Sequence, residues 1–214
     1  MTLKDAREDL RYLLDKGYKK RVALDFVANH YKLKRKDRNY LARYVFSEST
    51  IKKRRKKIAN PESLRGSKIL IDGYNVLISV ESVLRGDFFI AQDGFLRDSR
   101  GIFGKYKLND DTLKALKIVF KTLKILKVDF VKFYFDKNVS FSGELASIVR
   151  RLLKDYNIPG EVEVSPQVDY NIKRESDDFV VATSDSAIID KVKRVFDIPF
   201  FAWKYLIGGS IPNP

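Results

Sequence analysis

The stretch Lys68-Ile-Leu-Ile-Asp-Gly-Tyr-Asn-Val-Leu-Ile78 decides how the rest of the chain is interpreted. Its apolar run, residues 69–71, is typical of a strand buried on both faces in a parallel sheet. The run ends at Asp72, so a carboxylate lies at the carboxyl edge of the strand, where ligands bind in open α/β sheets. Asn75 follows three residues later and is close enough to approach the same edge. The alternative is an ordinary strand followed by an Asp-Gly turn.

Two later stretches repeat this pattern of an apolar run that ends in an aspartate. Residues 130–135 are strand-like and precede Asp136, and residues 179–183 are strand-like and precede Ser184 and Asp185. Parallel strands bring their carboxyl ends to one edge, so we predict an acidic cleft there. Like charges in a cleft repel one another unless a cation neutralises them, and hard oxygen ligands favour Mg²⁺ or Mn²⁺.

Three motifs resemble the strand-end motifs of PIN-like nucleases: Ile71-Asp-Gly-Tyr-Asn-Val76, Tyr134-Phe-Asp136 and Ala182-Thr-Ser-Asp185. The Asp-Gly-Tyr-Asn form is most similar to the NYN branch. The resemblance covers about residues 68–205 and depends on the order and spacing of the motifs, because each is short. It implies a three-layer α/β/α fold with a central parallel sheet, whose clustered acids bind divalent metal and hydrolyse RNA phosphodiesters. The whole chain also resembles a group of uncharacterised proteins that pair a small helical N-terminal region with a PIN-like domain.

The resemblance also implies which acids form the site. Family members carry a further acid at the start of the helix before the Thr-Ser-Asp strand, and Asp169 matches that place best. Asp177 and Asp178 are rivals, but they abut the strand and leave no room for a helix. Four acids are therefore expected to be catalytic and to hold one or two Mg²⁺ or Mn²⁺ ions: Asp72, Asp136, Asp169 and Asp185.

Other candidates around the site have less defined roles. Asn75, Thr183 and Ser184 are expected to orient metal ligands or substrate phosphate. Family members also carry an acid in the helix after the first strand region, and Glu81 matches that place only loosely, which leaves the second metal open. Nothing in the spacing of Asp98 fixes whether it joins the site.

The composition excludes several kinds of chemistry. The 214 residues contain no cysteine, which excludes disulfides, thiolate zinc sites and cysteine nucleophiles. His30 is the only histidine, so no site uses a histidine pair. Metal held by carboxylates is then the main remaining route to hydrolysis. The chain lacks a run of about 18 apolar residues, and its N-terminus lacks the apolar core of a signal peptide. We therefore expect a cytoplasmic protein that does not enter a membrane.

The positive charge is concentrated at the N-terminus and suggests a division into parts. Residues 1–67 contain 20 Lys and Arg against 8 Asp and Glu, whereas residues 68–214 contain 22 against 20. We predict a basic helical region at 1–60, a linker at 61–67 and a PIN-like domain at 68–214. Helices are expected at 4–16, 20–31 and 36–47, forming either a helix-turn-helix or a plain helical hairpin with a solvated basic face. A polyanionic partner, most simply nucleic acid, follows from this charge.

Two further segments are candidates for substrate binding. The first is a run of six consecutive cations, which is interpreted as the end of a helix that grips phosphate: Lys52, Lys53, Arg54, Arg55, Lys56 and Lys57. A flexible, solvated linker is the alternative. The second is residues 88–107, where a hairpin around Asp93-Gly94 leads into mixed aromatics, glycines and cations, including Arg97 and Arg100. This segment either wraps a nucleic-acid strand or merely covers the core.

The sequence thus predicts a metal-dependent ribonuclease, with RNA favoured over DNA as the partner. The alternative is a non-catalytic RNA- or DNA-binding protein with an inert PIN-like fold, because a fold does not guarantee activity. Toward the C-terminus we expect a helix at 187–195 and a last strand at 198–202. The oligomeric state stays open, a homodimer included.

Overall fold

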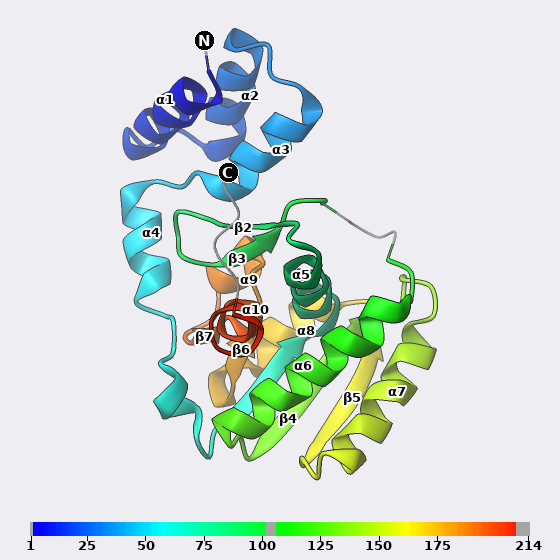
Figure 1. Cartoon of the computed structure of the whole chain (residues 1–214). Helices are drawn as coiled ribbons and strands as arrows, with labels where there is room; N and C mark the ends of the chain where they lie inside the picture. Colours follow the sequence, from blue (N-terminus) through cyan, green and yellow to red (C-terminus); the bar gives the residue numbers. More distant parts are fainter. Residues whose placement is uncertain (1, 102–105, 209–214) are drawn as a thin grey trace.

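The computed structural model describes residues 2–101 and 106–208, which form a helical N-terminal region and an α/β domain (Figure 1). The helical region consists of α1 (Leu3–Asp15), α2 (Lys20–His30), α3 (Arg35–Tyr44) and α4 (Glu48–Arg55). The strands are β1 (Lys68–Asp72), β2 (Phe88–Ile90), β3 (Leu96–Asp98), β4 (Phe130–Asp136), β5 (Gly160–Ser165), β6 (Val180–Ala182) and β7 (Val195–Phe196). The helices of the α/β domain are α5 (Gly73–Arg85), α6 (Asp110–Leu126), α7 (Ser142–Asp155), α8 (Val168–Glu175), α9 (Ser186–Ile189) and α10 (Ile198–Ala202).

The central sheet has five parallel strands in the order β5-β4-β1-β6-β7. Side chains of β1 alternate between its two faces. Ile69 and Ile71 pack with helices α5, α6 and α7, whereas Leu70 packs with α8 and α9 on the other face. All three side chains are fully buried, which explains the uninterrupted apolar run. The predicted α/β class, with a parallel central sheet and a helical N-terminal region, is confirmed.

The strand order places a ligand-binding crevice beside β1. The chain moves from β1 outward to β4 and β5, then returns to the other side of β1 to form β6 and β7. The direction of winding therefore reverses between β1 and β6. In open α/β sheets, ligands bind outside the carboxyl ends of the strands at such a reversal. Asp72 ends β1 and Thr183 follows β6, so both lie at this crevice.

Gly73 is required because helix α5 begins directly at the end of β1. A Cβ atom at this position would lie 2.6 Å from the carbonyl oxygen of Tyr134, closer than real Cβ contacts come. The glycine thus lets the first turn of α5 press against the end of β4. The Asp-Gly pair is consequently a strand-to-helix junction rather than the turn that was the alternative interpretation.

The N-terminal region has a core of its own, built where α1, α2 and α3 meet. Its buried apolar residues are Ala6, Leu10, Leu14, Ala23, Leu24, Val27, Leu41 and Val45. Residues 31–34 connect α2 and α3, and Lys32 adopts a left-handed conformation there, with φ 51°. The connection is therefore made without the glycine that usually marks a tight turn. Whether this unit acts as a helix-turn-helix stays a prediction.

The chain after α4, which includes the predicted linker at 61–67, is packed against the α/β domain. Val195 donates its N–H to the carbonyl of Lys57 at 2.9 Å, and the N–H of Ala59 donates to the carbonyl of Val195 at 2.8 Å. Residues 57–59 thus extend the sheet beyond β7. A 3₁₀ turn (Pro61–Leu64) follows, in which Leu64 is fully buried. Backbone pairing and this apolar anchor explain why the segment is ordered.

The hairpin is confirmed, but the expected last strand is wrong. Strands β2 and β3 pair antiparallel around the Asp93-Gly94 turn. Residues 198–202 form helix α10, because Asp197 caps it by accepting the N–H of Phe200 at 2.9 Å and Pro199 lies in its first turn. The last strand is β7, which begins at the final residue of the helix expected at 187–195, and α9 already ends at Ile189. Within the described residues, the helices are too short or too polar to cross a membrane.

Candidate active site at the carboxyl edge of the sheet

The four predicted acids line one pocket of about 230 Å³ at the carboxyl edge of the sheet. Asp72 ends β1, Asp136 ends β4, Asp169 lies in the first turn of α8, and Asp185 precedes α9. Each acid comes from a different element, yet the parallel strands bring them to the same edge. This geometry supports the sequence prediction that these acids converge.

Hydrogen bonds fix the two sides of the crevice to each other. The hydroxyl of Thr183 donates to Asp72 Oδ2 at 2.8 Å, which joins the ends of β6 and β1. Asn75 Oδ1 accepts from the N–H of Ser184 at 2.8 Å and from its hydroxyl at 3.0 Å. These bonds leave the Asn75 amide NH₂ as a donor on the pocket wall. The side chains predicted to orient ligands are thus held in place by the sheet itself.

The other three acids are held to different degrees. One carboxylate oxygen of Asp185 caps α9 by accepting the N–H of Ala187 at 2.6 Å and of Ile188 at 3.2 Å. Asp136 Oδ1 accepts both the N–H and the side-chain amide of Asn138, at 2.8 and 2.9 Å. Asp169 is exposed at the rim. The pocket therefore combines three positioned acids with one that is open to solvent.

The acids are close enough to shift each other's protonation. Burial, helped by the charges of Asp185 and Asp169, raises the pKa of Asp72 to about 7 against the opposing effect of the Thr183 hydrogen bond. Burial, followed by the charges of Asp185 and Asp136, also raises the pKa of Asp169. Carboxyl groups with raised pKa values in a cleft are typical of functional sites. They indicate a place that a cation would stabilise.

The oxygen ligands of the pocket fit Mg²⁺ or Mn²⁺, but the observed spacing between the carboxylates is too wide for a complete metal site. Carboxylate and amide oxygens are the ligands that these ions prefer. Within residues 2–101 and 106–208, however, no three Asp, Glu, His or Cys side chains are grouped closely enough to hold a metal ion. Side-chain rotations would be needed to bring the acids onto one ion.

Asp98 lines the same pocket but already has a cationic partner. Its Oδ2 accepts from the Arg43 guanidinium at 2.9 Å, and its Oδ1 accepts the N–H of Gly101 at 2.7 Å. Sequence reasoning missed Arg43, because nothing in its local pattern distinguishes it from the other cations of α3. The pair brings the helical region and the hairpin together at the edge of the acidic pocket.

Glu81 belongs to a different part of the domain. It is 1% exposed, accepts from the hydroxyl of Thr112 at 3.0 Å, and also accepts a short hydrogen bond from Tyr106. Arg85 is 3.9 Å away on the same helix. Glu81 therefore ties α5 to α6 and does not line the acidic pocket. The loose match of Glu81 to a family acid does not place it at the site.

Arg97 and Arg54 are not available to a substrate, contrary to expectation. Arg97 is 3% exposed, pairs with both oxygens of Asp93 at 2.7 and 2.8 Å, and donates to the carbonyl of Ser184 at 3.2 Å. Arg54, also 3% exposed, bridges Asp93 at 2.7 Å and Asp190 at 2.8 Å. Both arginines fix elements beside the site instead of binding phosphate.

The rest of the six-cation run divides between structural bonds and solvent. Lys57 donates to the carbonyl of Ile189 at 2.8 Å, and Arg55 donates to that of Gln92 at 2.9 Å. Lys52 pairs with Glu48 one turn earlier. Lys53 and Lys56 are exposed. The run is thus mainly the C-terminal part of α4 and its attachment to the α/β domain, and phosphate binding by its exposed members stays a prediction.

Comparisons with known proteins match both parts of the chain. Residues 61–200 match the model of a domain of unknown function (DUF5616), and residues 2–57 match a protein family of unknown function (DUF434). This chain belongs to the DUF5616 family. It is 41% identical over 209 residues to the uncharacterized protein MJ0935 of Methanocaldococcus jannaschii, covering 96% of this chain and 99% of that protein. No solved structure gives a significant match. Neither family description names a PIN-like domain, so that resemblance stays a prediction.

The raised pKa values in this DUF5616 domain predict a specific pH dependence of stability. The pKa values of Asp72 and of the buried Asp197 are both raised to about 7 from 3.8, chiefly by burial. Between these values the folded protein binds more protons than the unfolded chain, so stability falls as pH rises. In EDTA, urea unfolding should show lower stability at pH 7 than at pH 5. Asp72→Asn should reduce this difference, and an unchanged difference would contradict the assignment to Asp72.

Proposed function

We propose that this DUF5616 domain is a metal-dependent ribonuclease that hydrolyses phosphodiesters at its acidic pocket. The observation that carries the proposal is the convergence of four carboxylates from separate elements on one pocket at the reversal of strand order. Two of these carboxyls, Asp72 and Asp169, have raised pKa values, partly because of the neighbouring acids. A purely structural set of acids would pair with cations, as Asp93 does with Arg54 and Arg97.

The pocket also contains donors suited to a substrate. The Tyr74 hydroxyl is buried on the pocket wall and finds no hydrogen-bond partner in the part of the chain that the structure describes. The Asn75 amide NH₂ is a second donor at this pocket, because Ser184 occupies the Asn75 oxygen and not its nitrogen. Buried donors without an acceptor are costly, so a ligand oxygen is a natural partner. In this proposal both donors contact substrate phosphate.

All four acids are given a metal-holding role in this proposal, and one of them also handles a proton. Asp72, Asp136, Asp169 and Asp185 would hold Mg²⁺ or Mn²⁺, which on binding supplies a water of lowered pKa and offsets negative charge in the transition state. Asp72 is the innermost member and is fixed by Thr183, so it orients the set. Asp169, which is exposed at the rim, is placed to accept a proton that is passed to solvent. RNA is favoured over DNA on the resemblance to NYN nucleases alone.

A non-catalytic nucleic-acid-binding protein is the second candidate. It is favoured by two observations: the strongly basic N-terminal region, and the absence of three grouped metal-ligand side chains among the described residues. In that case, the acidic pocket would be an inert remnant of the fold.

A cleavage assay separates the two candidates. Single-stranded and structured RNA should be cut in Mg²⁺ or Mn²⁺ and left intact in EDTA, because carboxylates alone cannot supply the missing positive charge. The assay follows fragment formation on denaturing gels, with DNA of the same sequence run in parallel. Tight binding without cleavage in either metal would exclude the nuclease and leave the binding protein.

A further inference from the structure

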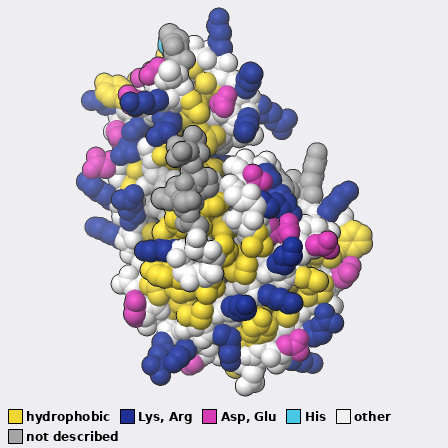
Figure 2. All heavy atoms as spheres, viewed as in Figure 1, with side chains coloured by type: hydrophobic (Ala, Val, Ile, Leu, Met, Phe, Trp, Pro, Cys, Tyr) yellow, Lys and Arg dark blue, Asp and Glu magenta, His cyan; other side chains and the backbone are white. Residues whose placement is uncertain are grey.

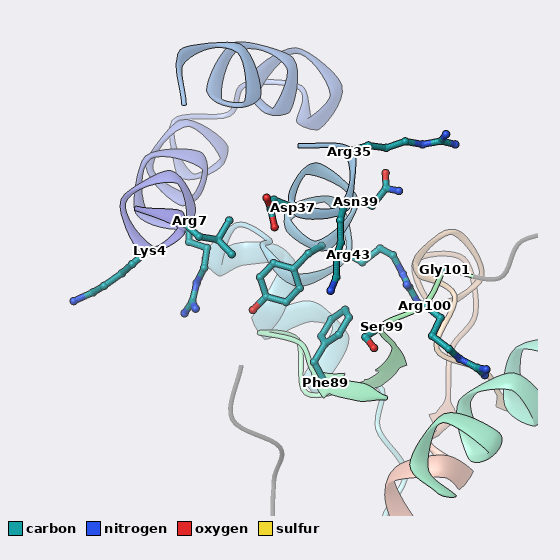
Figure 3. A pocket seen from close by; sticks show the side chains of 13 residues that line it. Lys4, Arg7, Arg35, Asp37, Asn39, Arg43, Phe89, Ser99, Arg100 and Gly101 are labelled. Carbon is teal, nitrogen blue, oxygen red and sulfur yellow. The ribbon is translucent and has the colours of Figure 1, made fainter. Parts of the chain in front are cut away.

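A second pocket lies between the helical region and the hairpin and is markedly basic. It has a volume of about 610 Å³ and is formed by α1, α3, strand β2 and the residues after β3 (Figure 3). Its cationic side chains are Lys4, Arg7, Arg35, Lys36, Arg43 and Arg100. Asp37 is its single acid among the described lining residues. Figure 2 shows Lys and Arg side chains spread over the helical region on the face in view. We call this hollow the helix–hairpin pocket.

Two of its arginines are incompletely satisfied. The Nε atoms of Arg7 and Arg100 are buried and have no hydrogen-bond acceptor within the described ranges. Their remaining contacts are with neutral groups: Arg7 donates to the Tyr44 hydroxyl and Arg100 to the Ser82 hydroxyl, each at 3.4 Å. Buried polar atoms are usually paired, and an unpaired guanidinium donor calls for an acceptor such as phosphate. The feature therefore points to an anionic ligand.

An aromatic pair adds a surface on which a base can stack. Tyr40 of α3 and Phe89 of β2 are in edge-to-face contact, with ring centroids 5.1 Å apart, and both line the pocket. Grooves that bind single-stranded nucleic acid combine cations along the backbone with aromatic rings on which bases stack. A duplex hides its base faces, so the rings favour a single strand.

The helix–hairpin pocket and the acidic pocket share one lining residue, Arg43. Arg43 lines both pockets and pairs with Asp98, which lines the acidic one. Figure 3 shows Arg43 on α3, with Ser99 and Arg100 on the hairpin side. A strand lying in the helix–hairpin pocket would thus pass Arg43 on its way to the acidic pocket.

We propose that the helix–hairpin pocket holds a nucleotide of a single-stranded RNA beside the acidic pocket. Separate phosphates of the strand lie on Arg7 and on Arg100, which Figure 3 shows on opposite sides of Phe89, and the base of the nucleotide contacts Phe89. The inference rests on the nucleic-acid partner of the proposed function and deepens it by naming the substrate class and where the strand lies. It also assigns a role to the N-terminal region, which forms one wall of the pocket.

The test measures binding without catalysis, by fluorescence anisotropy of a labelled single-stranded RNA in EDTA. Replacing Arg7→Gln and Arg100→Gln together should weaken binding at least about tenfold, because two charge-assisted hydrogen bonds are lost. The slope of log affinity against log salt should fall by about 1.4, or about 0.7 for each phosphate contact with a single strand. The double variant Lys117→Gln, Lys121→Gln removes the same charge from exposed positions on α6 and should change affinity less than about twofold.

A second variant guards against misfolding, since Arg7 and Arg100 are partly buried. Arg35 is exposed at the rim, so Arg35→Glu should weaken binding while leaving the circular dichroism and melting temperature unchanged. Deleting residues 1–60 is a poorer test, because it removes Arg54 and the backbone that pairs with β7. Wild-type affinity in both pocket variants, or an equal loss in the α6 control, would overturn the proposal.

Competitors identify the ligand that carries the phosphate. Adenosine monophosphate and inorganic phosphate should displace the RNA only weakly, and duplex RNA should bind less tightly than the single strand. If the mononucleotide displaces RNA at concentrations comparable to that of the RNA, the pocket binds a free nucleotide and the proposal of a bound RNA strand is overturned. If RNA binding depends on Arg7 and Arg100 but the protein never cleaves RNA, only the nuclease proposal is rejected. If the protein cleaves RNA and binding does not depend on these arginines, only the proposed role of the helix–hairpin pocket is rejected.

Discussion

The Asp72→Asn variant should cleave RNA at least about 100-fold more slowly than the wild-type protein, measured as kcat/KM in saturating Mg²⁺ or Mn²⁺. The substitution keeps the size of the side chain and the acceptor for the Thr183 hydroxyl, but removes one negative charge from the innermost member of the acid set. The remaining acids would bind the metal ion more weakly or hold it in a displaced position. Because the affected interaction acts on the transition state, the loss should appear mainly in kcat.

Two measurements distinguish this outcome from general damage. RNA binding in EDTA should persist, because the cations of the helix–hairpin pocket are untouched. The melting temperature should not fall, since the variant removes a carboxylate whose pKa is raised by burial. Asp155→Asn, at the exposed C-terminal end of α7, makes the same chemical change away from both pockets and should cleave at the wild-type rate. Full activity of Asp72→Asn would place the chemistry elsewhere.

The acidic pocket was predictable because parallel strands convert a repeated sequence pattern into proximity. Asp72, Asp136 and Asp185 each follow an apolar run, and the sheet brings those ends to one edge. Asp169 required the resemblance as well, because it does not directly follow an apolar run. Its place in the first turn of α8 agrees with the expected helix start. Whether the four acids hold metal is a matter of side-chain spacing, which strand patterns do not determine.

The basic features were harder to interpret, because charge alone does not say what a cation contacts. Arg54 stands within six consecutive cations, yet it is the member that faces inward, one turn after the buried Ile51. Arg97 and Asp98 are adjacent in β3 and point to opposite faces, so one meets Asp93 and the other Arg43. Arg43 pairs with Asp98 across 55 residues of sequence, and Arg54 pairs with Asp93 and Asp190 across 39 and 136, distances beyond the reach of local periodicity.

The second large effect is expected at Asp93, where Asp93→Asn should destabilise the protein by about 3–5 kcal/mol. The carboxylate is fully buried and accepts from Arg54 and from both terminal nitrogens of Arg97. Burial acts to raise the pKa of Asp93, but the hydrogen bonds and charges of Arg97 and Arg54 hold it below its ordinary value. Without that charge, two buried guanidinium groups would repel each other in a region of low dielectric.

This loss should be visible as a fall in melting temperature on the order of 10 °C for a protein of this size. Asp190→Asn provides the matched control, because Asp190 also pairs with Arg54 but its side chain is 50% exposed. That change should cost about 1 kcal/mol or less. In a double-mutant cycle, Asp93→Asn combined with Arg54→Met should cost less than the sum of the single changes, since each removes the need for the other.

The Asp93 cluster also explains how the N-terminal region is tied to the site. Arg54 lies in α4 and pairs with Asp93 in the hairpin turn. Arg97 donates to the carbonyl of Ser184, and the N–H of Ser184 in turn donates to the side chain of Asn75. Loosening the cluster should therefore weaken RNA cleavage even below the melting temperature, because the wall carrying Asn75 and Asp185 loses its support. Urea unfolding followed by fluorescence and by circular dichroism should remain a single coincident transition in the wild type. A separate early transition for the helical region would show that the cluster does not couple the two parts.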